Sequence, residues 1–469
     1  MTQAKNDTYD AVIIGAGMSG LVCGCYLAKA GMKVLIAEQH HKPGGYCTSF
    51  KRGDFTFDAA AHSFGSYREG GTMSMVLKEL GLSTRIKIIR YDPSDVIITP
   101  DHKISFWADL DKTVHELQKA FPYEPKIRDF MSFMNNPNPA DIAALRKRTF
   151  QDLLDKYFRS SKLKTIISLP VFGYGGLSPS LMSAFTGSKI FSEFLLDGGY
   201  YPAGGMQTLP DLLAERFKEF GGTLLLSCPV VRIKTRNLKT TGVISEKGDF
   251  IRSKNIVSNC DARQTFLKLL GKRIVTKELS DKLKNMDTSL SMVVLYLGID
   301  NYFRSLPKPG TNVWFLSHYD LEKAYLAAKK GDFEDVGGYM LRLSPDKKSI
   351  SAFVNAPFKN KKYWDNHKAI LLETFIKRIE KHTTPELSKH LLYKDAATPY
   401  TLFRYTLNYK GAAYGWESTP AQFAEPEFKK PSFIQGLYLT GHWTTYAQGI
   451  PGVVYLGYDI AKLILRKNK

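Results

Sequence analysis

A glycine-rich turn near the amino terminus constrains the fold of this chain more than any other feature. The apolar stretch Tyr9–Ile14 is rich in β-branched residues and predicts a strand. Gly15, Gly17 and Gly20 follow it with the spacing G-x-G-x-x-G. Gly15 allows a tight turn, Gly17 lets the backbone approach a pyrophosphate, and Gly20 lets helix and strand pack closely. The spacing therefore predicts a dinucleotide-binding turn.

The residues after this turn complete a βαβ unit. A helical stretch to Ala30 is followed by a second strand, Lys33–Ala37, and then by Glu38. The start of the helix offers free N–H groups and partial positive charge to phosphates, and we place Ala16 and Ser19 in the same binding loop. Glu38 can accept hydrogen bonds from ribose hydroxyls and would repel a 2′-phosphate, so NADP is not expected. The alternative is a glycine-rich turn that binds nothing.

Length and charge narrow the remaining possibilities. The chain has 469 residues, which favours two or more domains. It carries 65 Lys and Arg against 45 Asp and Glu, a formal net charge of +20. Such a balance favours an anionic partner, either lipid headgroups or nucleic acid. The basic residues are scattered and form no nucleic-acid-binding motif, so no nucleic-acid partner is predicted.

The cysteines and the apolar stretches indicate in which compartment the protein lies and whether it spans a membrane. Five cysteines are an odd number without paired metal spacing, which predicts reduced thiols, no metal site and a cytoplasmic protein. The first ten residues lack the pattern of a secretory signal peptide. Two stretches without charge, Thr165–Ser188 and Gly436–Tyr458, are interrupted by glycine and proline. We therefore predict that neither spans a membrane.

Four further segments carry a family resemblance that extends almost from end to end. They are QHHKPGGYCTSF after Glu38 with GDFTFDAAAHSFG beyond it, the block Tyr201–Ile233, the block Thr398–Trp416 and the block Gly436–Ile464. Together these segments resemble the superfamily of FAD-binding amine oxidases and phytoene desaturases. Within it, FTFDAAAHSFG and TPYTLFRYTLNYKGAAYGW resemble the branch of phytoene desaturases, carotenoid cis–trans isomerases and retinol saturases.

The resemblance implies that the cofactor is FAD and assigns further residues to it. A second glycine pair would run along the pyrophosphate and ribityl chain, and the residue after it is Tyr46, where many relatives have an arginine. A strand near residue 230 would hold the adenine through its backbone. The carboxy-terminal block would bring one glycine to the phosphates and open a helix toward the flavin. The residues implied in these roles are Gly44, Gly45, Tyr46, Val230, Gly441, Gly449, Ile450 and Pro451.

The positions of these blocks predict the domain organisation. The fold class is α/β, with a Rossmann-type FAD-binding domain and an inserted α+β substrate domain. The FAD-binding domain would comprise 1–95, 205–275 and 425–469, and the substrate domain 96–204 and 276–424. Strand-like runs at Ser291–Ile299, Gly337–Leu343 and Ile350–Ala356 predict a second sheet, as the floor of a substrate cavity.

The branch resemblance implies an oxidoreductase that exchanges hydride between flavin N5 and a long apolar isoprenoid of the carotenoid or retinoid type. Desaturation, saturation and cis–trans isomerisation all remain open. His62, Arg404 and Tyr405 are the candidate catalytic residues, and a structural histidine, an ordinary ion pair and a core tyrosine are the alternatives. His442 and Trp443 either abut the flavin or only pack. Two other functions stay open: a flavin amine oxidase for a small amine, and a non-enzymatic, FAD-loaded peripheral membrane protein.

An isoprenoid substrate has to be taken from a bilayer, so we expect peripheral association with an anionic membrane surface. The stretch 165–188 is apolar, aromatic and rich in turns, and it is flanked by Lys162, Lys164 and Lys189. Such a composition suits a tunnel entrance that dips into the membrane interface. Burial in the core would select the same composition, and is the alternative. The sequence does not predict an oligomeric state.

Overall fold

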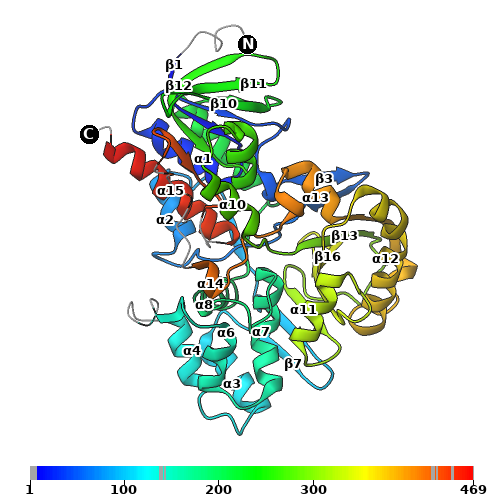
Figure 1. The fold of residues 1–469 in the computed structure, drawn as a ribbon. Coiled ribbons are helices and arrows are strands. Elements are labelled where there is room, and N and C mark those ends of the chain that lie inside the picture. Colours follow the sequence, from blue (N-terminus) through cyan, green and yellow to red (C-terminus); the bar gives the residue numbers. More distant parts are fainter. Residues whose placement is uncertain are drawn as a thin grey trace.

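In the computed structural model of the protein, the described residues are 8–136, 141, 144–423, 428, 431, 433–444 and 448–467. Two seven-stranded sheets dominate the fold. Figure 1 shows the first sheet at the top beside the amino terminus, the second at the right, and a group of helices below.

The first sheet is built around β1 (Thr8–Ile14). β2 (Val34–Ala37) and β12 (Phe250–Ser258) flank β1, and both are parallel to it. β9 (Thr223–Leu225) lies beyond β2, and β18 (Leu437–Leu439) pairs in parallel with the end of β12. β10 (Val230–Arg236) and β11 (Lys239–Ser245) continue the sheet in antiparallel order. Strands from distant parts of the chain thus end at one edge of the sheet, where α/β folds bind ligands.

Three helices cover one face of this sheet. α1 (Met18–Lys29) packs against α9 (Thr208–Glu219) and α15 (Gly449–Lys467). α1 is buried from Met18 to Ala28, because neighbours surround it on every side. Cys23 and Cys25 are both fully buried there, and burial raises the pKa of both thiols far above their usual range. These cysteines are therefore inert core residues.

The second sheet has the order β17-β13-β16-β15-β14-β6-β7. All neighbouring pairs are antiparallel except β14 with β6. β13, β14 and β15 are buried along their whole length, since helices and loops cover both faces. The strands are β6 (Asp95–Ile98), β7 (Lys103–Phe106), β13 (Ser291–Ile299), β14 (Asn312–Leu316), β15 (Gly338–Leu343), β16 (Ser349–Ala356) and β17 (Leu391–Ala397). The three predicted strand-like runs are confirmed as β13, β15 and β16, with shifts of at most one residue at the start.

Helices pack around the second sheet, and several have side-chain caps at their first turn. Thr149 and Asp152 form a capping box, and Asn360 accepts from the N–H of Tyr363. The helices are α3 (Leu110–Ala120), α4 (Ile127–Asn135), α6 (Phe150–Tyr157), α7 (Ser161–Gly175), α8 (Ala184–Ile190), the π-helix η3 (Phe191–Leu196), α11 (Leu321–Lys330), α12 (Lys361–His382) and α13 (Pro399–Thr406). Together they enclose the largest apolar core of the molecule.

Smaller elements connect the two sheets. Two short antiparallel pairs, β3 with β4 and β5 with β8, lie between them. The remaining elements are β3 (Ser49–Arg52), β4 (Phe55–Asp58), β5 (Ile88–Arg90), β8 (Tyr200–Pro202), α2 (Thr72–Glu79), α10 (Lys277–Asn285), α14 (Pro420–Phe423), the 3-10 turns η2 (Gly45–Cys47), η5 (Leu387–His390) and η6 (Tyr409–Gly411), and the π-helix η4 (Gln264–Gly271).

The strands of the first sheet come from 8–37, 223–258 and 437–439, and those of the second from 95–106, 291–356 and 391–397. On this distribution we propose the division into a discontinuous domain of 1–95, 205–275 and 425–469 and a second domain of 96–204 and 276–424.

The prediction that the stretch 165–188 forms a tunnel entrance at a membrane is wrong. This stretch forms α7 and the start of α8, and only Ser180 and Leu181 in it are exposed. Its apolar composition reflects burial in the core. The flanking lysines are engaged in ion pairs, Lys162 with Asp101, Lys164 with Asp155 and Lys189 with Glu193. Within the described part of the chain, no helix combines the length and apolar character that crossing a bilayer requires.

Candidate functional site

A large cavity lies between the two sheets. Its volume is about 1630 Å³, and both the amino-terminal and the carboxy-terminal glycine turns contribute to its wall. Of the predicted cofactor residues, those that line it are Gly15, Gly17, Ser19, Glu38, Gly44, Gly45, Tyr46, Val230, Gly441, Gly449 and Ile450. Ala16, Gly20 and Pro451 are not among its lining residues.

The two glycine turns meet across one asparagine. A Cβ atom on Gly17 would lie 2.9 Å from Asn259 Nδ2, and one on Gly441 would lie 2.6 Å from Asn259 Oδ1. The Nδ2 atom donates to the carbonyl of Gly15 at 3.3 Å. Sequence reasoning missed Asn259. It follows β12, and the end of a parallel strand beside β1 is the signal that could have identified it.

Close packing explains the third glycine of the turn. A Cβ atom on Gly20 would lie 2.2 Å from the carbonyl oxygen of Gly15, a backbone atom that cannot move aside. Gly15 has a positive φ of 97°, which side chains disfavour. Ser19 and Thr440 join their hydroxyl groups at 2.6 Å, and this contact ties α1 to the residue after β18.

Glu38 organises the loop from the end of β2. One carboxylate oxygen accepts from the N–H of Ala16 at 2.6 Å, and the other accepts from the N–H of His40 at 2.9 Å. The side chain is buried, with 6% exposure. Each carboxylate oxygen can accept further hydrogen bonds, so Glu38 can still bind two ribose hydroxyls from the cavity side. Val230 lines the same cavity.

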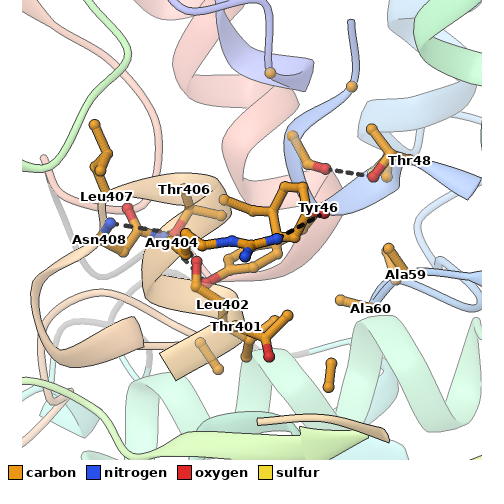
Figure 2. A pocket seen from close by; sticks show the side chains of 18 of the residues that line it. Tyr46, Thr48, Ala59, Ala60, Thr401, Leu402, Arg404, Thr406, Leu407 and Asn408 are labelled. Atoms are coloured by element: carbon orange, nitrogen blue, oxygen red, sulfur yellow. Dashed lines mark hydrogen bonds between the residues drawn. The ribbon is translucent and has the colours of Figure 1, made fainter. Parts of the chain in front are cut away.

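Tyr46 occupies the position after the second glycine pair. Gly44 has a φ of 129° and donates its N–H to the carbonyl of Ala16 at 2.9 Å. The Tyr46 hydroxyl donates to the carbonyl of Ala412 at 3.0 Å and accepts from Asn408 at 3.2 Å. Figure 2 shows Tyr46 facing the α13 segment across the cavity. Tyr46 thus links the glycine loop to the second half of the chain.

His442 and Trp443 follow Gly441. The His442 ring stacks on Tyr46 with a centroid distance of 6.3 Å and an interplanar angle of 19°, and it lines the cavity. Burial lowers its pKa to about 4, so the imidazole is uncharged at neutral pH. Trp443 is buried and donates its indole N–H to Asn408 at 2.8 Å. Of the two residues, His442 reaches the cavity and Trp443 packs behind it.

His62 lies on an apolar part of the cavity wall. Its ring faces Tyr174 at 6.1 Å and Phe353 at 5.4 Å. Nδ1 donates to the carbonyl of Ala60 at 3.2 Å, and Nε2 is buried without a hydrogen-bond partner among the described residues. Burial, aided by the charge of Arg342, lowers its pKa to about 3. His62 is therefore an uncharged imidazole whose free nitrogen can only accept.

A buried charge network lies behind His62. Arg342 on β15 donates to Asn312 at 3.0 Å, and Asn312 donates in turn to Asp95 at 3.1 Å. The guanidinium also lies 5.2 Å from the ring of Tyr201, whose hydroxyl donates to Asp58 at 2.7 Å. Burial raises the pKa of both carboxyls, and the charge of Arg342 opposes the rise. One arginine thus acts on the fully buried carboxyl of Asp95 and the partly buried carboxyl of Asp58, which come from different parts of the chain.

Arg404 and Tyr405 are exposed at the rim of the cavity. The Arg404 guanidinium donates to the hydroxyl of Tyr405 at 3.2 Å. The backbone carbonyl of Tyr405 accepts from His40, two residues after Glu38, at 2.5 Å. This position favours a role at the nucleotide end of the cavity over one in catalysis. The structure brings His62 together with Tyr174 and Phe353, and not with Arg404.

The arrangement fits FAD. α1 has no side-chain cap and no acidic residue in its first turn, which leaves N–H groups free for a pyrophosphate. Glycines remove the side chains that would block the cradle at Gly17 and Gly441. The carboxylate of Glu38 is set to accept from hydroxyls of a ribose. The described residues hold no cluster of three His, Cys, Asp or Glu side chains able to bind a metal ion.

Glu417 lies in the loop between η6 and α14, and it offers a test of how the stability of the fold depends on pH. Burial and the nearby Asp287 raise its pKa to about 7 from 4.5. Between pH 4.5 and about 7, the carboxyl of Glu417 is therefore protonated in the folded protein and ionised in the unfolded chain. The stability from this protonation is full below pH 4.5 and is lost as the pH rises through 7. We expect Glu417→Gln to be more stable than the parent protein at pH 8, by about 2–3 kcal/mol, and equally stable at pH 4.

Thermal unfolding at pH 4 and pH 8 measures this difference. Glu334→Gln is the matched control, because Glu334 is exposed and its substitution should have the same small effect at both pH values. Equal melting temperatures for Glu417→Gln and the parent protein at pH 8 would contradict the prediction.

Comparisons with known proteins bear on the whole chain. The profile of the family described as flavin containing amine oxidoreductase matches residues 18–465. All-trans-retinol 13,14-reductase of Danio rerio is 25% identical, over 98% of this chain and 86% of its own length. Prolycopene isomerase of Daucus carota is 25% identical, over 97% of this chain and 79% of its own length. Phytoene desaturase (lycopene-forming) of Pantoea ananas is 25% identical, over 97% of this chain and 98% of its own length.

Solved structures share the fold. An oxidoreductase from Methanosarcina mazei superimposes with a TM-score of 0.67 at 16% identity, over 96% of this chain and 99% of that chain. Putrescine oxidase bound to putrescine superimposes with a TM-score of 0.66 at 15% identity, over 98% of this chain and 99% of that chain. At such low identity the likeness establishes the fold, an α/β architecture with a Rossmann-type FAD-binding domain, as predicted from the sequence.

Proposed function

This chain belongs to the family of flavin containing amine oxidoreductases and is an FAD-dependent enzyme, and from that premise we propose that it acts on carbon–carbon bonds of a long apolar isoprenoid. The proposal covers carotenoid-like and retinoid-like substrates. The chemistry that FAD supplies is hydride exchange between its N5 atom and a substrate carbon, so that desaturation, saturation and cis–trans isomerisation share one site.

The residues proposed to hold FAD come from both ends of the chain. The free N–H groups of α1 and the turn at Gly15 and Gly17 would bind the pyrophosphate, and Glu38 would bind the ribose. The start of α15 at Gly449 and Ile450 would face the flavin ring. Val230 would contact the adenine through its backbone. Tyr46 and His442 would cover the cofactor with their stacked rings.

The apolar part of the cavity carries the substrate proposal. Its wall includes His62, and the other residues of this part are aliphatic or aromatic: Phe50, Ala60, Tyr174, Ile190, Phe194, Met292, Tyr296, Phe353, Leu372 and Ala397. A wall of this kind holds a hydrocarbon chain by burying its surface, at about 25 cal/mol per Å². It also excludes water from the reacting bond. The three relatives named above, by their names, act on a retinol, a prolycopene and a phytoene.

Membrane association is proposed from the charge at the cavity rim. Lys51, Arg52 and Arg404 are exposed there, and none of them pairs with a carboxylate in the described ion pairs. Basic side chains at a membrane surface contribute about 1 kcal/mol each toward anionic lipids. The five cysteines are free thiols, which supports a reducing compartment such as the cytoplasm. We propose peripheral association through this rim, and no nucleic-acid partner.

An amine oxidase is the second candidate, because putrescine oxidase shares the fold. A small amine is charged at neutral pH and needs a carboxylate or an aromatic cage. Among the described residues, Asp365 and Asp395 line the same cavity, Asp395 opposite Tyr296 in the sheet, but Asp365 pairs with Lys361 at 2.7 Å and Asp395 pairs with Lys368 at 2.5 Å. His62 is held uncharged. A non-enzymatic, FAD-loaded peripheral protein is the third candidate. The extent of the apolar wall and the pairing of these carboxylates favour the isoprenoid over a small amine, and turnover of a substrate distinguishes an enzyme from a carrier.

The experiment is anaerobic incubation of the FAD-loaded protein with liposomes that contain phytoene, a cis-carotene or retinol. It is run once with oxidised flavin, which can accept hydride, and once with flavin reduced beforehand by dithionite, which can donate it; empty liposomes are the control. We expect one of the three lipids to change, detected by absorption spectra and chromatography. A longer conjugated system indicates desaturation, a shorter one saturation, and an unchanged length with new geometry isomerisation. Oxygen consumption with putrescine but no lipid turnover would replace the proposal with an amine oxidase. Bound FAD with no turnover of any substrate would contradict both enzymes and support the non-enzymatic, FAD-loaded protein.

His62 is the remaining catalytic candidate. The uncharged Nε2 atom can accept a hydrogen bond from a reacting group, but a pKa of about 3 makes it a weak base at neutral pH. We propose that His62 orients the substrate beside Tyr174.

A further inference from the structure

Gln39 and His40 make contacts that the proposed function does not use. Both residues follow Glu38 at the end of β2, in the part of the chain that carries the glycine turn. Their side chains reach Tyr405 on α13, more than 360 positions later in the sequence. His40 Nε2 lies 2.5 Å from the backbone carbonyl of Tyr405, and Gln39 Nε2 donates to the same carbonyl at 3.1 Å. The His40 ring also lies 5.7 Å from the Tyr405 ring.

The chemistry of these atoms fixes the direction of the contact. A carbonyl oxygen only accepts, so His40 must carry its proton on Nε2 to bind it. The backbone N–H of His40 donates separately to Glu38 at 2.9 Å. His40 therefore joins the carboxylate that faces the ribose to a helix of the second half of the chain. Its side chain donates to the carbonyl of Tyr405 on α13, and its backbone N–H donates to Glu38.

α13 forms part of the cavity wall on this side. Figure 2 shows Thr401, Leu402 and Arg404 along the wall opposite Tyr46 and Ala60. Glu38, Gln39, His40, Arg404 and Tyr405 all line the same cavity. A nucleotide held by Glu38 would lie beneath the contact between His40 and Tyr405. It could not leave on this side while the contact is closed.

α13 ends at a residue in a left-handed conformation. Leu407 caps the helix with a φ of 58°, a left-handed conformation that disfavours branched side chains. Such a conformation costs on the order of 1 kcal/mol or more and is held in place by surrounding contacts. The contacts at Tyr405 are among those that hold this turn in place, and their loss would weaken the attachment of the end of α13.

We propose that His40 is a positioning residue that latches α13 over the adenosine end of FAD, so that the cofactor is released only when this contact opens. The latch consists of the Gln39 and His40 side chains on one side and the Tyr405 carbonyl on the other. It requires FAD binding, which the family membership establishes, and does not depend on the identity of the substrate.

The test is the rate at which FAD leaves the protein. After dilution, free FAD is followed by its fluorescence in the parent protein and in His40→Ala. We expect release from His40→Ala to be about ten times faster, since one hydrogen bond of about 1.4 kcal/mol is lost. The backbone N–H to Glu38 remains in this variant. His41→Ala is the matched control, because His41 is the neighbouring histidine, is exposed and makes no described hydrogen bond. Its release rate should equal that of the parent protein.

Hydrogen exchange of residues 399–407 provides the second readout. The latch predicts faster exchange of α13 in His40→Ala and unchanged exchange in His41→Ala. His40→Gln keeps an N–H donor and should lie between the two. Equal release rates in all three variants would overturn the proposal, and so would faster release with unchanged exchange of α13. Neither outcome depends on turnover, so a failure of the isoprenoid proposal would not affect this result.

Discussion

Glu38→Ala is expected to lose FAD. The substitution removes the acceptor of the buried N–H of Ala16 and of the partly buried N–H of His40, and also the proposed acceptor for the ribose hydroxyls. A buried donor left without a partner costs about 1–3 kcal/mol. The glycine loop would then hold its binding geometry only at this additional cost. We expect the dissociation constant for FAD to rise at least about 100-fold, equivalent to about 3 kcal/mol.

Calorimetric titration of the FAD-free protein measures this loss, and the flavin absorbance of the purified protein gives a second value. Glu246→Ala is the control, because Glu246 is an exposed carboxylate on the wall of the same cavity. Glu38→Gln keeps one acceptor oxygen and should bind FAD with intermediate affinity. Stoichiometric FAD in Glu38→Ala, with an affinity within about threefold of the parent protein, would refute the role of this carboxylate.

Arg342→Met is expected to cause the largest loss of stability. The guanidinium is buried, with 4% exposure, and it is linked to Asp95 through Asn312 and to Asp58 through Tyr201. Removing it takes the positive charge away from the fully buried Asp95 and the partly buried Asp58. Arg342 forms no ion pair with either carboxyl in the described ion pairs, so the expected cost is that of losing a charged hydrogen-bonding group from a buried network, about 1.5–3 kcal/mol. The free energy of unfolding in urea measures the change.

A second arginine gives the comparison for Arg342. Arg378 on α12 also packs on an aromatic ring, but its described hydrogen bonds go to the backbone carbonyls of Phe333 and Glu334. Arg378→Met should therefore cost clearly less. Adding Asp95→Asn to Arg342→Met should restore part of the lost stability, because one of the uncompensated carboxyls is removed. If both single variants lose the same stability, the charge network is not what Arg342 stabilises.

Local signals in the sequence were enough to predict the first two strands of the first sheet and the glycine turn between them. The strand at Tyr9–Ile14, the three glycines and Glu38 lie within thirty residues, and each has a steric or electrostatic requirement that few residues meet. The strands β13, β15 and β16 were also predictable, because continuous apolar runs indicate buried strands. Strand order was not predictable in this way, since β18 joins β12 from almost two hundred residues later.

The site was only partly predictable for the same physical reason. Glycine positions carry their own signal, but Asn259 and Arg342 acquire their roles from contacts between remote segments. The stretch 165–188 misled because an apolar, turn-rich composition serves a buried helix as well as a membrane surface. Arg404 and Tyr405 were singled out from a shared sequence block. Only the fold shows that they lie beside His40 at the rim.

The contact between Ser19 and Thr440 has a consequence for biosynthesis. The hydroxyl groups that meet at 2.6 Å belong to residues 421 positions apart in the sequence. A ribosome-bound chain that stops before β18 can form the first βαβ unit, but it lacks the second glycine turn and the start of α15. The flavin nucleotide would therefore be captured only after the residues up to the start of α15 have emerged, and chains that stop before β18 should remain colourless.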